Sequence, residues 1–251
     1  MKLDKQDLNI LRELDLDPKI NVSKLAKTIR LSQQVVDYRI KKLIENKTIT
    51  SFGTIINLAK IGYQQYKLLF QFASINNEVK DKIVNYLKEN NKVYWAAIVG
   101  GKWDLFITVF VKDYADLESF LDDLFGKFPN TLKDYEAIYS VHHEFYTHKY
   151  LSETPNSIKL DLSKIENIDL DNLDFKILSK IQSNFRMSSL EISKYCDTTY
   201  KTVQNRISSL EKNEVIAGYR LFMNLEEYKP YLLLISFQSY GRDVEKKIIA
   251  Y

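Results

Sequence analysis

The feature that most constrains this chain is an internal repeat. Shifted by 167 residues, the sequence matches itself without a gap. "LDKQDLNILREL" (Leu3 to Leu14) aligns with "LDNLDFKILSKI" (Leu170 to Ile181), and "VVDYRIKKLIENKTI" (Val35 to Ile49) aligns with "TVQNRISSLEKNEVI" (Thr202 to Ile216). A unit of this length is too long for a solenoid repeat. The chain is therefore expected to use one two-part module twice.

The repeat predicts the domain boundaries. We expect a first head at residues 1–60, a body at 61–146, a linker at 147–169, a second head at 170–227 and the beginning of a second body at 228–251. Tyr251 corresponds to Val84, inside an expected helix, so we expect the second copy to be unfinished. From the repeat alone we expect the intact protein to be longer by about one half-module.

Each head is predicted to hold three short helices and an extended wing. In the first head, Asp4, Asn21 and Ser32 are polar residues suited to cap the three helices. Val36, Ile40 and Leu43 form one apolar stripe along the third helix. The stretch "TITSFGTIINL" follows as a wing, which completes a winged helix-turn-helix.

The polar face of the third helix is the first candidate binding surface. A helix of this kind fits the DNA major groove, where amide side chains read base edges and cations contact phosphates. The candidates for reading bases are Gln33, Gln34, Asp37 and Tyr38, and those for phosphates are Ser32, Arg39, Lys41 and Lys42. Arg39 lies at the edge of the buried stripe, so a bridge to a carboxylate of the head is an equal alternative.

Charge separates the parts of the chain. Residues 1–60 hold 12 Lys and Arg against 7 Asp and Glu, whereas residues 61–150 hold 10 against 12. This excess favours a polyanionic partner for the first head. Residues 168–225 hold 8 against 7, so we expect weaker DNA binding by the second head, or a partly structural role. Its DNA candidates are Tyr200, Lys201, Gln204, Asn205 and Arg206.

The body reads as a β-α-β-β-α-β sandwich of the ferredoxin-like type. Strands are expected at 66–72, 93–99 and 105–111, helices at 78–90 and 114–125, and a last strand over "YEAIYSVHHEFY". The polar linker holds Pro155 and is expected to be loosely packed, although alternating Ile158, Leu160 and Leu162 leave an edge strand open as an alternative. The overall fold class is α+β.

Together these segments resemble the Lrp/AsnC family of feast/famine transcription regulators. The matching stretches are "LDKQDLNILREL", "VSKLAKTIRLSQQVVDYRIKKLIENKTI", "INLAKIGY" and "VGGKWDLFITVFV". The resemblance covers residues 3–146 and resumes at Leu170. It implies a head that binds double-stranded DNA and a body that senses a small molecule and oligomerises. Because the family usually has one head per chain, two heads here could form an internal pseudo-dimer.

The resemblance also implies an effector site in the "GGKWD" turn. Family members bind amino acids or related metabolites between paired bodies, in clefts shaped by a glycine and an aspartate of this turn. The corresponding residues are Gly101 and Asp104, with Lys102 and Trp103 between them. Asp104 is suited to an ammonium group and Lys102 to a carboxylate. A plain β-connection, with Trp103 packed at an interface, is the alternative.

Two other functions are compatible with this architecture. Sirohaem decarboxylases share this architecture, but their branch carries a His-Asn-Tyr-type motif and an Arg-Ile-Gly-Ala-type wing where this chain reads "KVYWAAIVGG" and "TSFGTIINL". The sequence contains no phosphate loop, no G-x-S-x-G motif and no Rossmann turn. We therefore expect that the protein is not an enzyme. An interaction scaffold that lost DNA binding is the third alternative, and weak salt dependence of DNA affinity would support it.

Composition limits the remaining classes. No run of about 18 apolar residues could span a membrane. The single cysteine, Cys196, is expected to be a small core residue of a protein in the reducing cytoplasm. His142 and His143 are adjacent on an expected strand and point to opposite faces, so we expect no metal and no cofactor.

Overall fold

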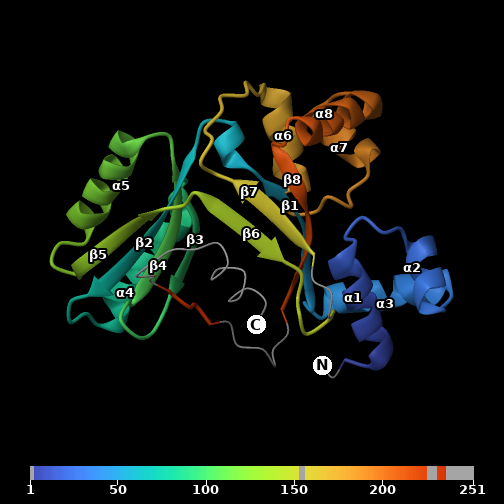
Figure 1. The fold of residues 1–251 in the computed structure, drawn as a ribbon, viewed down its shortest axis with the longest axis horizontal. Helices are drawn as coiled ribbons and strands as arrows, with labels where there is room; N and C mark the ends of the chain where they lie inside the picture. The colour runs from blue at the N-terminus through green and yellow to red at the C-terminus, as the bar shows by residue number, and fades with distance from the viewer. Residues whose placement is uncertain (1–2, 153–155, 225–230, 236–251) are drawn as a thin grey trace.

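The computed structural model describes residues 3–152, 156–224 and 231–235. The body lies on one side of the molecule and the two heads on the other, with two-stranded ribbons between them (Figure 1). Winged helix-turn-helix heads and a ferredoxin-like body are both present, as the sequence predicts.

The first head contains α1 (Lys5–Leu16), α2 (Val22–Ile29), α3 (Gln33–Glu45) and the wing strand β1 (Ile49–Ile56). The three predicted N-caps are confirmed, because Asp4, Asn21 and Ser32 each accept backbone N–H groups of the first turn that follows. The predicted stripe of α3 is buried against α1 and α2.

The second head repeats this construction with α6 (Asn172–Ile181), α7 (Ser189–Cys196), α8 (Tyr200–Lys212) and the wing strand β8 (Ile216–Met223). Its α7 ends at Asp197 in the left-handed region, as α2 ends at Arg30, which corresponds to it in the repeat. Cys196 lies in the core of this head, as predicted, and burial raises the pKa of its thiol.

The body follows a 3₁₀ turn, η1 (Leu58–Lys60). Its elements are β2 (Gln64–Phe72), α4 (Asn77–Glu89), β3 (Val93–Ile98), β4 (Leu105–Val111), α5 (Tyr114–Lys127) and β5 (Leu132–Tyr139). The strands form one antiparallel sheet in the order β3-β4-β2-β5, with a core between the sheet and the two helices. This is the predicted β-α-β-β-α-β order.

The last strand of the body differs from the prediction. "YEAIYSVHHEFY" divides into β5 and a separate strand β6 (His142–Tyr146), which leaves the sheet. The backbone N–H of Ser140 still bonds Gln65 of β2, but the carbonyl of Val141 accepts from Leu162 in the connector. The chain changes partner between these two residues, so one strand becomes two.

The linker is also better ordered than its composition predicts. It contains β7 (Ser157–Asp161), which pairs antiparallel with β6 rather than with an edge of the body sheet. Leu160 and Leu162 are buried against Ile55 of the wing. The segment expected to begin a second body lies mostly outside the described residues, and residues 231–235 show no regular secondary structure.

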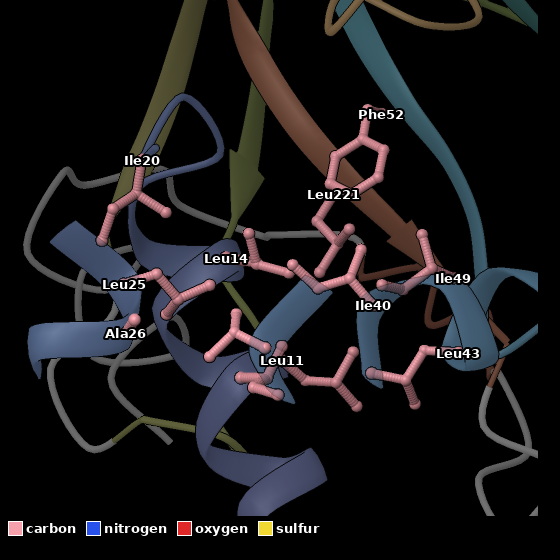
Figure 2. Packing of buried hydrophobic residues seen from close by; sticks show 12 residues of the cluster. Leu11, Leu14, Ile20, Leu25, Ala26, Ile40, Leu43, Ile49, Phe52 and Leu221 are labelled. Carbon is pink, nitrogen blue, oxygen red and sulfur yellow. The ribbon is translucent and has the colours of Figure 1, made fainter. Parts of the chain in front are cut away.

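The two wings pair with each other. β1 and β8 form a separate antiparallel ribbon, so the heads are joined inside one chain. Leu221 of β8 is fully buried in the core of the first head, beside Phe52 and Ile40 (Figure 2). In return, the Thr54 hydroxyl of β1 donates to the Ile181 carbonyl of the second head, at 2.7 Å.

Candidate nucleic-acid interface

The outer face of α3 is built by helical periodicity. Val36, Ile40 and Leu43 are buried, which turns the intervening residues away from the core. The exposed candidates are Ser32, Gln33, Gln34, Asp37, Tyr38, Lys41 and Lys42. Tyr38 is 65% exposed, a high exposure for a large aromatic side chain. The structure therefore brings seven of the eight candidates onto one surface.

Two of these seven exposed candidates also make contacts within the head. The Gln33 amide donates to the Ser23 hydroxyl of α2, at 3.0 Å. The Ser32 hydroxyl accepts from the Val35 N–H as the helix cap. Neither contact buries the side chain, but each fixes an orientation before any partner arrives.

Arg39 takes the alternative that the sequence left open. Its Nη1 lies 2.8 Å from an Asp4 oxygen and 2.7 Å from an Asp7 oxygen. These two carboxylates raise the pKa of the Arg39 guanidinium. The Asp7 N–H and then Arg39 hold the pKa of Asp4 below its usual value. Arg39 therefore ties α3 to α1, and its guanidinium is engaged inside the head.

The same arrangement recurs in the second head. Arg206 contacts Asp171 at 2.8 Å and Asp174 at 3.1 Å. The remaining four candidates of this head, Tyr200, Lys201, Gln204 and Asn205, are all exposed on α8. In each head, an arginine between two aspartates holds the recognition helix, and that helix presents a polar face. We call this arginine with its two aspartates the frame of the head.

Four charged residues near these faces were not singled out from the sequence. Arg30 and Lys47, exposed at the two ends of α3 in the first head, correspond to Asp197 and Glu214 in the second. The Glu214 carboxylate lies 2.8 Å from the Lys60 ammonium. The sign of the charge therefore reverses between equivalent positions of the two heads. Aligning the two copies of the repeat would have identified these four residues from the sequence.

The effector candidates lie in the turn between β3 and β4. Gly101 has a φ of +108°, which glycine adopts without strain, and the space around it is open. The Asp104 carboxylate accepts from the Phe72 N–H at 2.8 Å. Trp103 is buried against Leu69 and Phe106, while Lys102 is exposed and its ammonium lies 4.6 Å from the Trp103 ring.

The histidines of the body and the connector form no metal site within the described residues. His142 is exposed and His143 stacks on Phe145, and burial lowers the pKa of His143 to about 4. Within the described residues, no three His, Cys, Asp or Glu side chains converge as a metal site. No helix in the described part of the chain is long and apolar enough to cross a membrane.

Comparison with known proteins agrees with this geometry. The AsnC-type helix-turn-helix domain family matches residues 3–44, and a winged helix-turn-helix DNA-binding family matches residues 170–217. An uncharacterised HTH-type transcriptional regulator of Pyrococcus furiosus is 34% identical over 127 residues, which cover 50% of this chain and 83% of that protein. The chain belongs to the Lrp/AsnC family. It is accordingly a DNA-binding transcription regulator rather than an enzyme.

Two solved structures show how the fold compares. An AsnC family regulator of Agrobacterium tumefaciens aligns with a TM-score of 0.52 at 24% identity, covering 58% of this chain and 94% of that one. The sirohaem decarboxylase NirDL aligns with a TM-score of 0.57 at 17% identity, covering 87% of this chain and 65% of that one. At these identities both likenesses concern the fold alone.

Proposed function

We propose that the first head binds double-stranded DNA sequence-specifically by placing α3 in the major groove. The observation that carries this proposal is the exposed face of α3, where amides, a phenol, a carboxylate and two lysines stand together. A solvated helix needs no such selection of hydrogen-bonding groups at its N-terminal half. Residues at the N-terminal end of a recognition helix are those that contact base edges.

The roles divide along the helix. Gln33, Gln34, Asp37 and Tyr38 occupy the N-terminal half and read bases, because amides bond adenine and a carboxylate accepts from cytosine. Lys41 and Lys42 lie one to two turns further on and contact phosphates, together with the Ser32 hydroxyl. Arg39 supports the interface by holding α3 against α1.

The test measures affinity of the full chain for random duplex DNA across a salt series. Each lysine that contacts a phosphate contributes about 0.9 to the slope of log affinity against log salt. Lys42→Ala should weaken binding to all sequences and flatten this slope, and Lys82→Ala on α4 is the matched control in the body. Absence of binding at low salt would contradict the proposal and favour the scaffold alternative.

We further propose that an amino acid or a related metabolite binds beside the 100–104 turn and changes DNA affinity. Open space at Gly101 and the exposed Lys102 ammonium support this. Asp104 is already bonded to the Phe72 N–H, so it shapes the turn as well as offering its second oxygen. Calorimetric titration with individual amino acids tests the proposal: Lys102→Ala should weaken binding, Lys112→Ala should not, and no heat from any amino acid would contradict it.

We also propose that the bodies of two chains pair with each other. The protein would act in the cytoplasm, on the DNA there. Tyr94, Trp95 and Ile98 of the edge strand β3 are 47 to 54% exposed, and such residues are enriched at protein interfaces. Sedimentation of the wild-type chain against Trp95→Lys should show a shift toward the monomer. Equal sedimentation of the two proteins would count against this surface.

A further inference from the structure

The wing ribbon relates the two heads by a local two-fold axis. Gly53 pairs with Arg220, and these two residues are equivalent in the repeat. On either side the partners exchange: Phe52 pairs with Leu221, and Thr54 pairs with Tyr219, the equivalent of Phe52. An interface in which residue i meets j while j meets i is isologous, which is the signature of two-fold symmetry.

Contacts outside the ribbon hold this relation in place. The Lys19 ammonium lies 3.8 Å from the Tyr219 ring, and its equivalent, Arg186, lies 4.5 Å from the Phe52 ring. Arg186 also donates to the Pro18 carbonyl at 2.8 Å. Each head therefore places a cation on the wing aromatic of the other, so the exchange seen in the strand pairing recurs in the side-chain contacts.

The frame of the two heads is retained, whereas the faces that they present are not. Both have the arginine between two aspartates, and α3 and α8 are equal in length. Six exposed positions on these helices all differ. In order along the helix they read Gln33 and Tyr200, Gln34 and Lys201, Asp37 and Gln204, Tyr38 and Asn205, Lys41 and Ser208, and Lys42 and Ser209.

From this combination we infer that the chain recognises a non-palindromic DNA element, made of two unlike half-sites related by the local two-fold axis. The inference rests on the proposed function, and it specifies the partner of the same surface. Two heads related by a two-fold axis bind half-sites whose centres lie about one turn of the DNA helix apart, or a multiple of it. Unlike faces then read different bases in each half. One chain thus supplies both halves of the reader and gives the element a direction.

The side chains indicate how the half-sites differ. The paired amides Gln33 and Gln34 favour adenine in the half that α3 reads. Lys201 favours guanine, and Asn205 favours adenine, in the half that α8 reads. Because Lys41 and Lys42 are replaced by serines in α8, the first half-site carries more of the phosphate contacts and more of the salt dependence.

The experiment selects high-affinity duplexes from a random library with the full chain. It then compares the selected element with two palindromes, each built from one half-site repeated in inverted orientation. We expect the selected element to bind about 10-fold or more tightly than either palindrome. Insertion of about five base pairs between the halves should also weaken binding, because it turns the half-sites to opposite sides of the duplex.

Variants assign each half to a head. Gln34→Ala should relax base preference in one half only, and Gln204→Ala in the other half only. A palindromic selected element, palindromes bound as tightly as it, or both variants acting on the same half would overturn the inference while leaving DNA binding intact. Failure of the proposed function looks different, because then no duplex binds at low salt.

Discussion

The two heads have the same frame and different surfaces. Each is held by an arginine on its recognition helix that bridges two aspartates of its first helix, at distances between 2.7 and 3.1 Å. Around that frame, Arg30 and Lys47 of the first head correspond to Asp197 and Glu214 of the second. The difference shows that the positions that stabilise the heads and those that face solvent have changed separately.

The largest expected effect comes from the contacts that each wing makes with the other head. Leu221→Ala removes a fully buried side chain from the first head and should lower the free energy of unfolding by about 3 kcal/mol. Thr54→Ala, at the equivalent position, loses one hydrogen bond and should lower it by about 1 kcal/mol. Urea denaturation of the full chain measures both. Losses below about 0.5 kcal/mol for both would mean that the wings pair differently.

The arginine frame gives a smaller and unequal effect. Arg39→Ala leaves the Asp7 carboxylate buried without its partner and should lower the free energy of unfolding by about 2 kcal/mol. The Arg206 side chain is 39% exposed against 22% for Arg39, so Arg206→Ala should lower it less. The same denaturation experiment ranks the two variants, and a larger loss for Arg206→Ala would contradict this account.

The DNA-facing lysines separate the heads further. Lys41→Ala should reduce the slope of log affinity against log salt by about 0.9 and lower affinity for any duplex. Ser208→Ala, at the equivalent position of α8, should leave the slope unchanged because no charge is removed. Filter binding on random DNA between low and moderate salt provides the measurement. Equal slopes for the two variants would show that α3 makes no phosphate contact at Lys41.

The smallest expected effect concerns acid. The fold lowers the pKa of both Asp4 and Asp171, first through the backbone N–H three residues on and then through the arginine. Each carboxylate therefore stabilises the protein above its unfolded pKa of about 4, and that stability is lost as the pH falls through the lower folded pKa. Asp4→Asn keeps the helix cap and removes the charge. It should make stability less pH-dependent below pH 4, to an extent similar to Asp171→Asn.

Most of the local structure could be predicted from the sequence. Helix caps such as Asp4 and Ser32, and the stripe of Val36, Ile40 and Leu43, are local signals, and the structure confirms them. The body strands are equally local, because each is a compact run of apolar residues.

The strand pairings that the sequence did not predict are non-local. Nothing in "SFGTII" states that its partner is a strand beginning at Ile216, and nothing in "YSVHH" states that the chain changes partner there. Strand pairing depends on which apolar side chains become buried when the strands meet, and here these are Leu160 and Leu221. The face of α3 could be predicted from periodicity, whereas the commitment of Arg39 to two aspartates required three-dimensional contacts.

The central claim is that one frame presents two unlike reading faces, and transplanting one face onto the other head tests it most directly. The transplant carries the residues of α3 onto α8 in the full chain. Its substitutions are Tyr200→Gln, Lys201→Gln, Gln204→Asp, Asn205→Tyr, Ser208→Lys and Ser209→Lys. An unfolding midpoint close to that of the wild type serves as the control for folding.

The measurement is the affinity of this variant for the selected element and for the palindrome built from the α3 half-site. The account predicts that preference moves from the original element to the palindrome built from the α3 half-site. Unchanged preference for the original element, in a variant that folds, would contradict the claim that these six positions of α8 read DNA.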